Sequence, residues 1–303
     1  MPTTTFMLLG GLGNQLFQLA GALAWQARTG RTVVLNTSLL TPPAWRGYTP
    51  RTLALTGLAG LPPIRAGGPP AAVLVGLDRL GGGLAVVERT PADDVTSRIV
   101  PRTRWVLGYF HDHPTVCAAA DVLTPALTAR LVLARTHEEE MDRQARAGRT
   151  ALVAGRYLAV HIRLGDFAGD ARTTAHHGLT DPAYYAAAVA ELLADTGLST
   201  VVVVSDNPPA AAALLAASGP ELPAEVLTRS AADPWADLAV LADAGGVVMS
   251  NSSFSWWGAW LAVGARSAPV IAPRPWLAPG VPEPPRLLPA QWRQRQRTLR
   301  IPG

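Results

Sequence analysis

Side chains that could bind phosphate or move a proton follow a predicted strand at Tyr157–Ile162. His161, Arg163 and Asp166 lie at its carboxyl end, where open α/β sheets bind their ligands. Strand alternation puts His161 and Arg163 on the same side, and the planar guanidinium of Arg163 matches the oxygens of a phosphate. Asp166 could orient either of them. The pattern predicts an anion site, and the alternative is a buried structural ion pair.

A run of small hydroxyl residues links a predicted strand at Val247–Ser250 to a predicted helix at Ser255–Val263. A helix that begins in this way directs N–H groups and hydroxyls to one point, which suits a diphosphate. The expected contacts come from Asn251, Ser252, Ser253, Phe254 and Ser255. We expect Trp256, Trp257 and Trp260 to pack in the core rather than to stack on a sugar.

The segment Gly10-Gly11-Leu12-Gly13-Asn14-Gln15 joins a predicted strand at Thr5–Leu9 to a predicted helix at Gln15–Arg28. Glycine lets the backbone approach a ligand closely, and a helix N-terminus favours an anion. A dinucleotide-binding turn would have a glycine at Leu16 and an acidic residue at Asn36. The segment is therefore either a turn facing some other ligand or a tight strand-to-helix connection.

Two further aspartates are candidates for nucleoside contacts. Asp206 follows a predicted strand at Val201–Val204, where it could accept from a ribose hydroxyl or a base N–H, or cap the next helix. Asp237 lies on a predicted helix at Pro234–Asp243 and could reach a purine edge or lie on a solvated face.

These segments belong to two series of alternating strands and helices, which predict parallel α/β sheets. The chain has 303 residues, enough for two cores, and the Gly/Arg-rich stretch Ala147–Arg156 separates the two series. We therefore expect an α/β fold of two Rossmann-like domains facing a cleft, with domains at 1–150 and 151–303. Thr41–Gly83 gives no clear elements, and the proline-rich tail Arg274–Gly303 is expected to be irregular.

Composition excludes several classes of site. All 26 basic residues are arginine, so a Walker-type phosphate loop and a lysine Schiff base are excluded. A single cysteine, Cys117, excludes an internal disulfide and a cysteine zinc site, and it fits a cytoplasmic protein. The histidines lack metal-ligand spacing and there is no Asp-x-Asp pair, so no metal is expected. The apolar stretches are broken by Asp, Ser and Pro, so no transmembrane segment is expected.

Five segments, in this order, make the chain similar to the α-1,2-fucosyltransferase family. They are Gly10–Ala20, Gly108-Tyr109-Phe110, His161–Phe167, Ser205-Asp206 and Ser250–Leu261. The segments come from both halves of the chain, and the first and the last are the most specific.

The resemblance implies a glycosyltransferase of the two-domain B-type fold, a galactoside α-1,2-fucosyltransferase. The donor would be GDP-β-L-fucose, with no metal or other cofactor. Fucose would be transferred with inversion to the 2-hydroxyl of a terminal β-galactoside. The N-terminal domain would bind the acceptor, an oligosaccharide or a glycolipid, and the C-terminal domain the GDP-sugar. No nucleic-acid partner is implied, and membrane contact would be at most peripheral.

The resemblance also implies roles for residues of the second half. Arg163 matches the arginine that neutralises the β-phosphate of the leaving GDP. His161 and Asp206 fall where the family contacts the nucleoside, and Asp237 would accept from guanine. Ser252–Ser255 match the diphosphate-binding turn.

In the first half, Gly11 and the run Gly13-Asn14-Gln15 would face the fucose. The chain departs from the family at Leu164, where a second arginine is usual. This weakens a role that needs two guanidinium groups and leaves Arg163 in place. Asp166 and Asp112 are the candidates for a base on the acceptor hydroxyl, although the reaction could proceed with little help from a base.

The sequence leaves two other functions open. One is a related glycosyltransferase with another nucleotide-sugar or linkage. The other is a non-catalytic module that binds a nucleotide or a glycan. The tail arginines Arg293, Arg295, Arg297 and Arg300 could touch an anionic lipid or the acceptor, or lie on a solvated surface.

Overall fold

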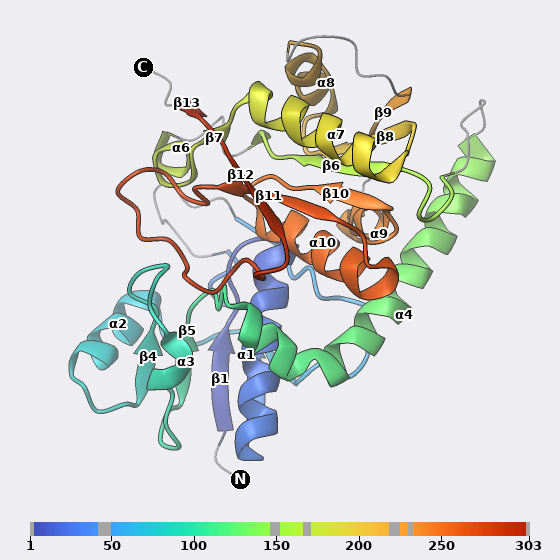
Figure 1. Cartoon of the computed structure of the whole chain (residues 1–303). Helices are drawn as coiled ribbons and strands as arrows, with labels where there is room; N and C mark the ends of the chain where they lie inside the picture. Colours follow the sequence, from blue (N-terminus) through green and yellow to red (C-terminus); the bar gives the residue numbers. More distant parts are fainter. Residues whose placement is uncertain are drawn as a thin grey trace. The chain divides into compact units, whose positions relative to one another are not determined.

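Figure 1 shows the chain as a computed structural model, in which residues 3–41, 50–145, 152–165, 171–217, 225–229 and 233–300 are described. Its contacts divide it into two units. The first contains Met1–Arg130 and Pro282–Pro289, and the second contains Leu131–Val281 and Ala290–Gly303. The division falls inside helix α4 (His113–Ala145), whereas the boundary expected after residue 150 lies outside the described residues.

The first unit is built on a parallel five-stranded sheet in the order β3-β2-β1-β5-β4. Its strands are β1 (Thr3–Met7), β2 (Thr32–Asn36), β3 (Ile64–Arg65), β4 (Ala85–Val87) and β5 (Trp105–Leu107). Its shorter helices are α2 (Ala71–Arg79) and α3 (Val95–Arg98).

Helices cover both faces of this sheet because alternate side chains of β1 point to opposite sides. Met7 shares a buried cluster with Leu74 of α2. Phe6 contacts the ring of Phe110, which in turn abuts Gly21 of helix α1 (Leu12–Thr29). The first unit is thus a doubly wound α/β unit.

The second unit has a parallel six-stranded sheet in the order β12-β11-β10-β6-β8-β9. Its strands are β6 (Leu158–Ile162), β8 (Thr200–Ser205), β9 (Glu225–Arg229), β10 (Gly246–Val248), β11 (Val270–Arg274) and β12 (Arg293–Gln296). A two-stranded antiparallel ribbon pairs β7 (Leu179–Thr180) with β13 (Leu299–Arg300).

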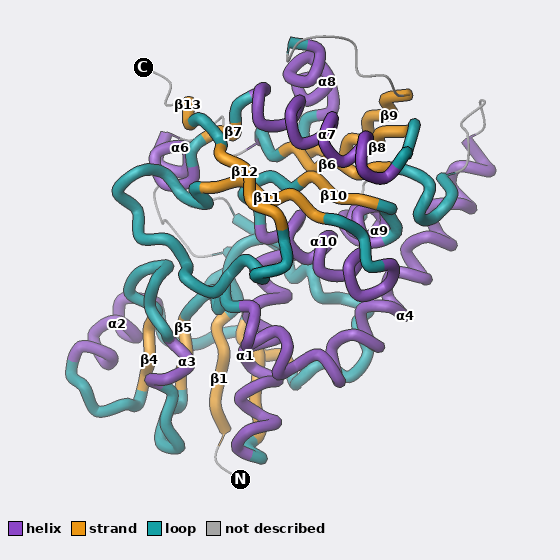
Figure 2. The backbone as a smooth tube through the Cα atoms, viewed as in Figure 1, coloured by secondary structure: helices purple, strands orange, loops and turns teal. Residues whose placement is uncertain are grey.

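Five further helices complete this unit among the residues described. They are α6 (Ala171–His177), α7 (Pro182–Thr196), α8 (Pro208–Ala216), α9 (Pro234–Ala242) and α10 (Ser253–Arg266). Figure 2 shows α7 on one side of the sheet and α9 and α10 on the other. Helices α9 and α10 pack so closely that a Cβ on Gly258 would clash with the side chain of Leu241. The predicted α/β class and the two parallel-sheet units are therefore confirmed, and the cleft between them stays a prediction.

Some element boundaries were predicted well and others wrongly. The Asp181 cap of α7 is confirmed, since Asp181 accepts from the N–H of Tyr184 and Gly197 ends the helix at φ 67°. Helix α1 begins at Leu12 rather than Gln15, because Gly10 makes the turn with φ 71°. The unassigned region before Gly83 contains β3 and α2, and the supposedly irregular tail contains β12 and β13.

Helix α4 begins at His113, where the sequence indicated a start near Thr124. Over His113–Thr136 it is long and apolar enough to cross a membrane, by length and composition. The sequence analysis took Asp and Pro residues as breaks in the apolar stretches. Helix α4 nevertheless continues through Asp121 and Pro125, so its apolar stretch is longer than expected. The expectation that every apolar stretch is too short to span a membrane is therefore wrong for α4, by length and composition.

Candidate functional site

Two neighbouring strand ends of the second sheet meet at a buried histidine. Strands β6 and β10 pair in register, and His161 Nδ1 lies 2.7 Å from the Oγ of Ser250. The imidazole of His161 also packs against the ring of Phe254, at 5.3 Å between centroids. Burial, and to a smaller extent the charge of Arg163, lower the pKa of His161 to about 3. His161 is therefore a neutral hydrogen-bonding group near pH 7, and it does not act as a general acid.

The hydroxyl-rich turn before α10 is built as a helix cap. The N–H of Phe254 donates to the Oγ of Ser252, which is the N-cap residue. The Oγ of Ser255 is fully buried and donates to the carbonyl oxygens of Ser250 and Ser252, at 3.0 Å each. The hydroxyls of Ser252 and Ser255 thus hold the turn, and the positive end of the helix dipole at Ser253 is the feature suited to an anion.

Arg163 and Asp206 meet where β6 and β8 end. Arg163 Nη1 lies 3.1 Å from Asp206 Oδ2, and about a quarter of each side chain is exposed. Asp206 also accepts from the N–H groups of Leu164 and Gly165, at 3.0 and 2.9 Å. A Cβ on Gly165 would clash with the Asp206 carboxylate, so this turn needs glycine. Asp206 therefore fixes the backbone beside Arg163 and holds its guanidinium at the sheet edge.

Asn251 is buried, and its side chain is used inside the protein. Its Nδ2 donates to the carbonyl oxygens of His177 and Trp276. The guanidinium of Arg297, 3% exposed, donates to the same two carbonyls and to Pro275, Gly178 and Thr180 as well. From the sequence, Arg297 was expected to touch an anionic lipid or the acceptor, or to lie on a solvated surface. The structure instead buries it, and its guanidinium joins the tail to the same carbonyls that Asn251 contacts.

The three other acidic candidates differ in their surroundings. Asp237 lies in the first turn of α9 and is 8% exposed, so the solvated-face alternative is wrong. Asp112 accepts from the N–H and hydroxyl of Thr115 and pairs with Arg286, which gives it a capping role at the start of α4. Asp166 lies outside the described residues.

In the first unit, the glycine segment forms the opening turn of α1. Gln15 is fully buried; its Nε2 donates to the carbonyls of Gly10 and Thr52, and its Oε1 accepts from the N–H of Ala54. Gln15 thus holds a neighbouring loop. Asn14 is less buried, and its Oδ1 lies 3.2 Å from His111 Nε2.

Gly11 and Gly13 flank the start of this helix in different ways. Gly11 is the N-cap residue, with no side-chain cap, and a Cβ there would meet nothing within 4 Å. Gly13 is buried in the first turn of the helix. The residues expected to face the fucose thus divide into a buried support, Gln15, and the partly exposed Asn14.

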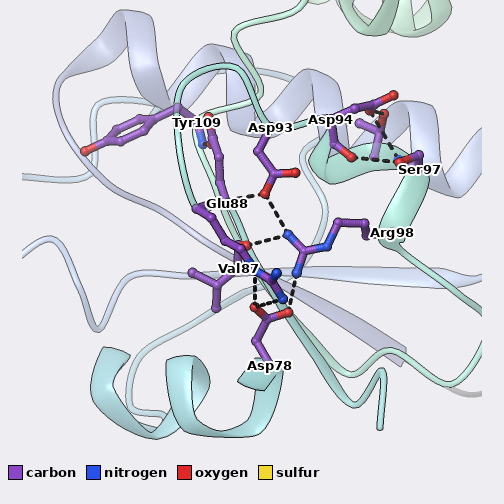
Figure 3. Close-up of polar contacts among 10 residues, drawn as sticks. Asp78, Val87, Glu88, Asp93, Asp94, Ser97, Arg98 and Tyr109 are labelled. Atoms are coloured by element: carbon purple, nitrogen blue, oxygen red, sulfur yellow. Dashed lines mark hydrogen bonds and ion pairs between the residues drawn. The ribbon is translucent and has the colours of Figure 1, made fainter. Parts of the chain in front are cut away.

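Sequence reasoning missed a carboxylate at the edge of the same sheet. Glu88 directly follows β4 and lies beside Tyr109 (Figure 3), from whose backbone N–H it accepts. It also accepts from the backbone N–H of Phe110. The motif Gly108-Tyr109-Phe110 was recognised, but its partner was not, since no element was predicted at β4. The strongest available signal was the apolar run Ala85–Val87 ending in an acidic residue.

No group of three or more His, Cys, Asp or Glu side chains suited to a metal ion is found within the part of the chain that the structure describes. Trp256 and Trp257 are fully buried and contact each other at 5.2 Å between centroids. Their predicted role in core packing is confirmed.

The family comparison bears directly on the second unit. Residues 134–276 match the model of Glycosyl transferase family 11. This stretch includes Arg163, Asp206 and the α10 turn, and the resemblance inferred from the sequence is confirmed. The match supports glycosyl transfer as the coarse activity.

Several solved structures are similar to the chain, each at low identity. The fucosyltransferase NodZ from Bradyrhizobium is 14% identical, with a TM-score of 0.44, covering 85% of this chain and 91% of its own. The E. coli heptosyltransferase WaaC, solved with ADP, is 14% identical with a TM-score of 0.47, covering 98% and 93%. A mutant of Arabidopsis thaliana FUT1, in complex with GDP, is 13% identical with a TM-score of 0.45, covering 86% and 68%. No curated protein matches the sequence significantly.

Proposed function

We propose that this protein transfers L-fucose from GDP-β-L-fucose to the 2-hydroxyl of a terminal β-galactoside, with inversion and without a metal ion. The observation that carries the proposal is the arrangement inside the family 11 segment. Arg163, the neutral His161 and the N-terminus of α10 all lie at the carboxyl ends of β6 and β10.

The donor is proposed to bind through its diphosphate. Leaving-group departure puts negative charge on the β-phosphate, and hydrogen-bond donors fixed in advance stabilise such charge most effectively. Arg163 is held in place by Asp206, whose two oxygens are themselves fixed by backbone N–H groups. The dipole of α10 adds a second source of positive potential. Together these groups supply the charge stabilisation that a metal provides in other transferases.

The imidazole of His161 is proposed to contact the nucleoside as an uncharged group. With its pKa lowered to about 3, it does not compete with Arg163 for the phosphate. Its Nδ1 is occupied by Ser250, which leaves Nε2 as the ring atom for a ligand. Asp237 is proposed to accept from the guanine.

The proposal also covers the acceptor and the compartment in which the reaction takes place. The acceptor is an oligosaccharide or a glycolipid ending in β-galactose, and the reaction takes place in the cytoplasm without a cofactor.

The test is mass spectrometry of the purified protein incubated with GDP-L-fucose, EDTA and a lactose-type acceptor. A fucosylated product that an α-1,2-specific fucosidase cleaves would support donor, linkage and metal independence together. A product resistant to that enzyme would refute the linkage. No product from GDP-fucose, with transfer from another nucleotide-sugar, would favour the related glycosyltransferase. GDP binding without transfer from any donor would favour the non-catalytic module.

A further inference from the structure

The strands of the first sheet bring Glu88 beside two motifs that the sequence singled out. Val87 of β4 and Met7 of β1 are both in register with Leu107 of β5. The next residue after β4 is Glu88, and its N–H donates to the carbonyl of Leu107 at 2.7 Å. Glu88, the Gly108–Phe110 motif and the turn that leads to Asn14 therefore lie at one edge of this sheet.

The Glu88 carboxylate is held against the backbone of the β5 turn. Its Oε2 accepts from the N–H of Tyr109, and the carboxylate also accepts from Phe110. A Cβ on Gly108 would lie 2.8 Å from the same oxygen, so glycine leaves room for the carboxylate. Phe110 takes a left-handed backbone conformation, φ 56°, which a residue other than glycine rarely adopts. The turn is thus shaped around the carboxylate.

The arginines around Glu88 are engaged by other acids. Arg98 donates to the carbonyl of Val87 and pairs with Asp93 and Asp78. Arg89 donates through Nε and Nη2 to Asp78. Figure 3 shows the Arg98 guanidinium turned to Asp78, Asp93 and the Val87 carbonyl. Among the described residues, the partners of the Glu88 carboxylate are backbone N–H groups and no cation.

This environment raises the pKa of Glu88 to about 7. Burial is the largest cause; the N–H groups of Tyr109 and Phe110 oppose it, and the negative charge of Asp93 adds to it. Among the described residues, the titratable and charged groups around this edge are Asp78, Arg89, Asp93, Asp94, Arg98, Tyr109 and His111. A carboxyl that changes charge near neutral pH is suited to general base catalysis.

The surface next to Glu88 has the chemistry of a sugar site. Tyr109 is 36% exposed and stacks on His111, with 5.4 Å between ring centroids. His111 in turn contacts the amide of Asn14. An aromatic face for the C–H groups of a sugar therefore lies beside amide and carboxylate groups for its hydroxyls.

We propose that Glu88 is the general base of the acceptor site, and that its carboxylate takes the proton of the galactoside hydroxyl that is fucosylated. This inference rests on the proposed function. As the acceptor oxygen bonds to the anomeric carbon of fucose, the bond from that carbon to the β-phosphate oxygen breaks. The electron pair leaves with GDP, and Glu88, now protonated, returns the proton to water.

A purely structural role would not require a carboxylate. An amide or a hydroxyl can accept from the same N–H groups at a smaller desolvation cost. The carboxylate instead remains partly charged near neutrality at a place where ionisation is costly. This favours a group selected for proton transfer.

The decisive variant is Glu88→Gln, which keeps an oxygen for the N–H of Tyr109 and loses the base. With wild-type transfer established, we expect kcat to fall by about 100- to 10,000-fold with a small change in the KM for GDP-fucose. The wild-type rate should rise with pH through about 7, and this acidic limb should be absent from the variant. Unchanged turnover, or a limb that persists in Glu88→Gln, would overturn the inference.

A control and a rescue separate this result from misfolding and from failure of the proposed function. Glu191→Gln removes a carboxylate paired with Arg293 and Arg295 in the second unit, and it should leave turnover unchanged. In Glu88→Gly, added formate should restore part of the transfer rate if the missing group is a base; no rescue of folded protein that still binds GDP would contradict the role. A wild type that transfers no fucose would instead refute the proposed function itself.

Discussion

In the second unit, the carboxyl edge of the sheet gathers Arg163, the positive end of α10 and an imidazole whose pKa is lowered to about 3. In the first unit, the corresponding edge carries a carboxyl whose pKa is raised to about 7. Burial is the largest cause of both shifts, and it acts in opposite directions because one group is charged when protonated and the other when deprotonated. Of these two groups, only Glu88 can therefore exchange a proton near neutral pH. The comparison indicates that one edge is suited to holding an anion and the other to accepting a proton.

In the second unit, the largest expected effect is at Arg163. Arg163→Ala should lower turnover by about 100- to 1000-fold, equivalent to about 3–4 kcal/mol, because a preset donor to the leaving group is lost. Steady-state kinetics with GDP-fucose measures this loss. The exposed Arg156, changed to alanine, is the matched control and should retain normal rates. Near-normal turnover in Arg163→Ala would show that Arg163 does not stabilise the leaving diphosphate.

The next effect is on folding, at Arg297. Arg297→Met should reduce the free energy of unfolding by about 2–4 kcal/mol, because buried carbonyls lose their donor. Arg295→Met serves as the control; Arg295 pairs with Glu191 at a more exposed position, and the change should cost less than about 1 kcal/mol. Urea unfolding compares the two. Equal losses would show that the Arg297 network does not stabilise the second unit.

A smaller effect is expected at the turn before α1. Gly10→Ala should destabilise the protein by about 1–2 kcal/mol, since alanine is strained at φ 71°. Its Cβ would also clash with the Asn14 amide and displace it from its place beside His111. Gly11→Ala is the control, because its Cβ meets nothing within 4 Å. A thermal melt in which both variants match the wild type would contradict the assigned turn.

The last prediction concerns the pH dependence of stability. The folded pKa of Glu88 is about 7, above its ordinary value of 4.5, so the unfolded chain releases this proton first as pH rises. The stabilisation is complete below 4.5 and is lost as pH rises through about 7. Chemical unfolding should show the stability of the wild type, relative to Glu88→Gln, declining across this window. A difference that stays constant would mean that Glu88 titrates normally.

The sequence predicted the second unit better than the first for physical reasons. Strand β6 is apolar apart from His161, strand β8 has four valines in a row, and the Asp181-Pro182 cap marks the start of α7. Strand β4 has only three residues, and an apolar run of that length is too short to distinguish a strand from a loop. Glu88 was missed for that reason, since its importance depends on a contact with a turn 21 residues away.

The roles of individual polar side chains were harder to predict than their locations. Asn251, Ser255 and Gln15 belong to the recognised motifs, yet their polar atoms hydrogen-bond within the protein. Spacing along the chain identifies the turn. It does not show which side-chain atoms hydrogen-bond to backbone groups within the protein and which are left for a ligand. That information depends on tertiary contacts such as the one between Asn251 and the carbonyl of Trp276.

Nucleotide binding at the edge of the second sheet is tested most directly by calorimetric titration of GDP into the wild type and into Arg163→Ala, with EDTA present. We expect the wild type to bind GDP without metal, and Arg163→Ala to bind it at least about tenfold more weakly, a loss of about 1.4 kcal/mol. Equal GDP affinity in the two proteins, or no GDP binding by the wild type, would contradict the assignment of this edge to the nucleotide diphosphate.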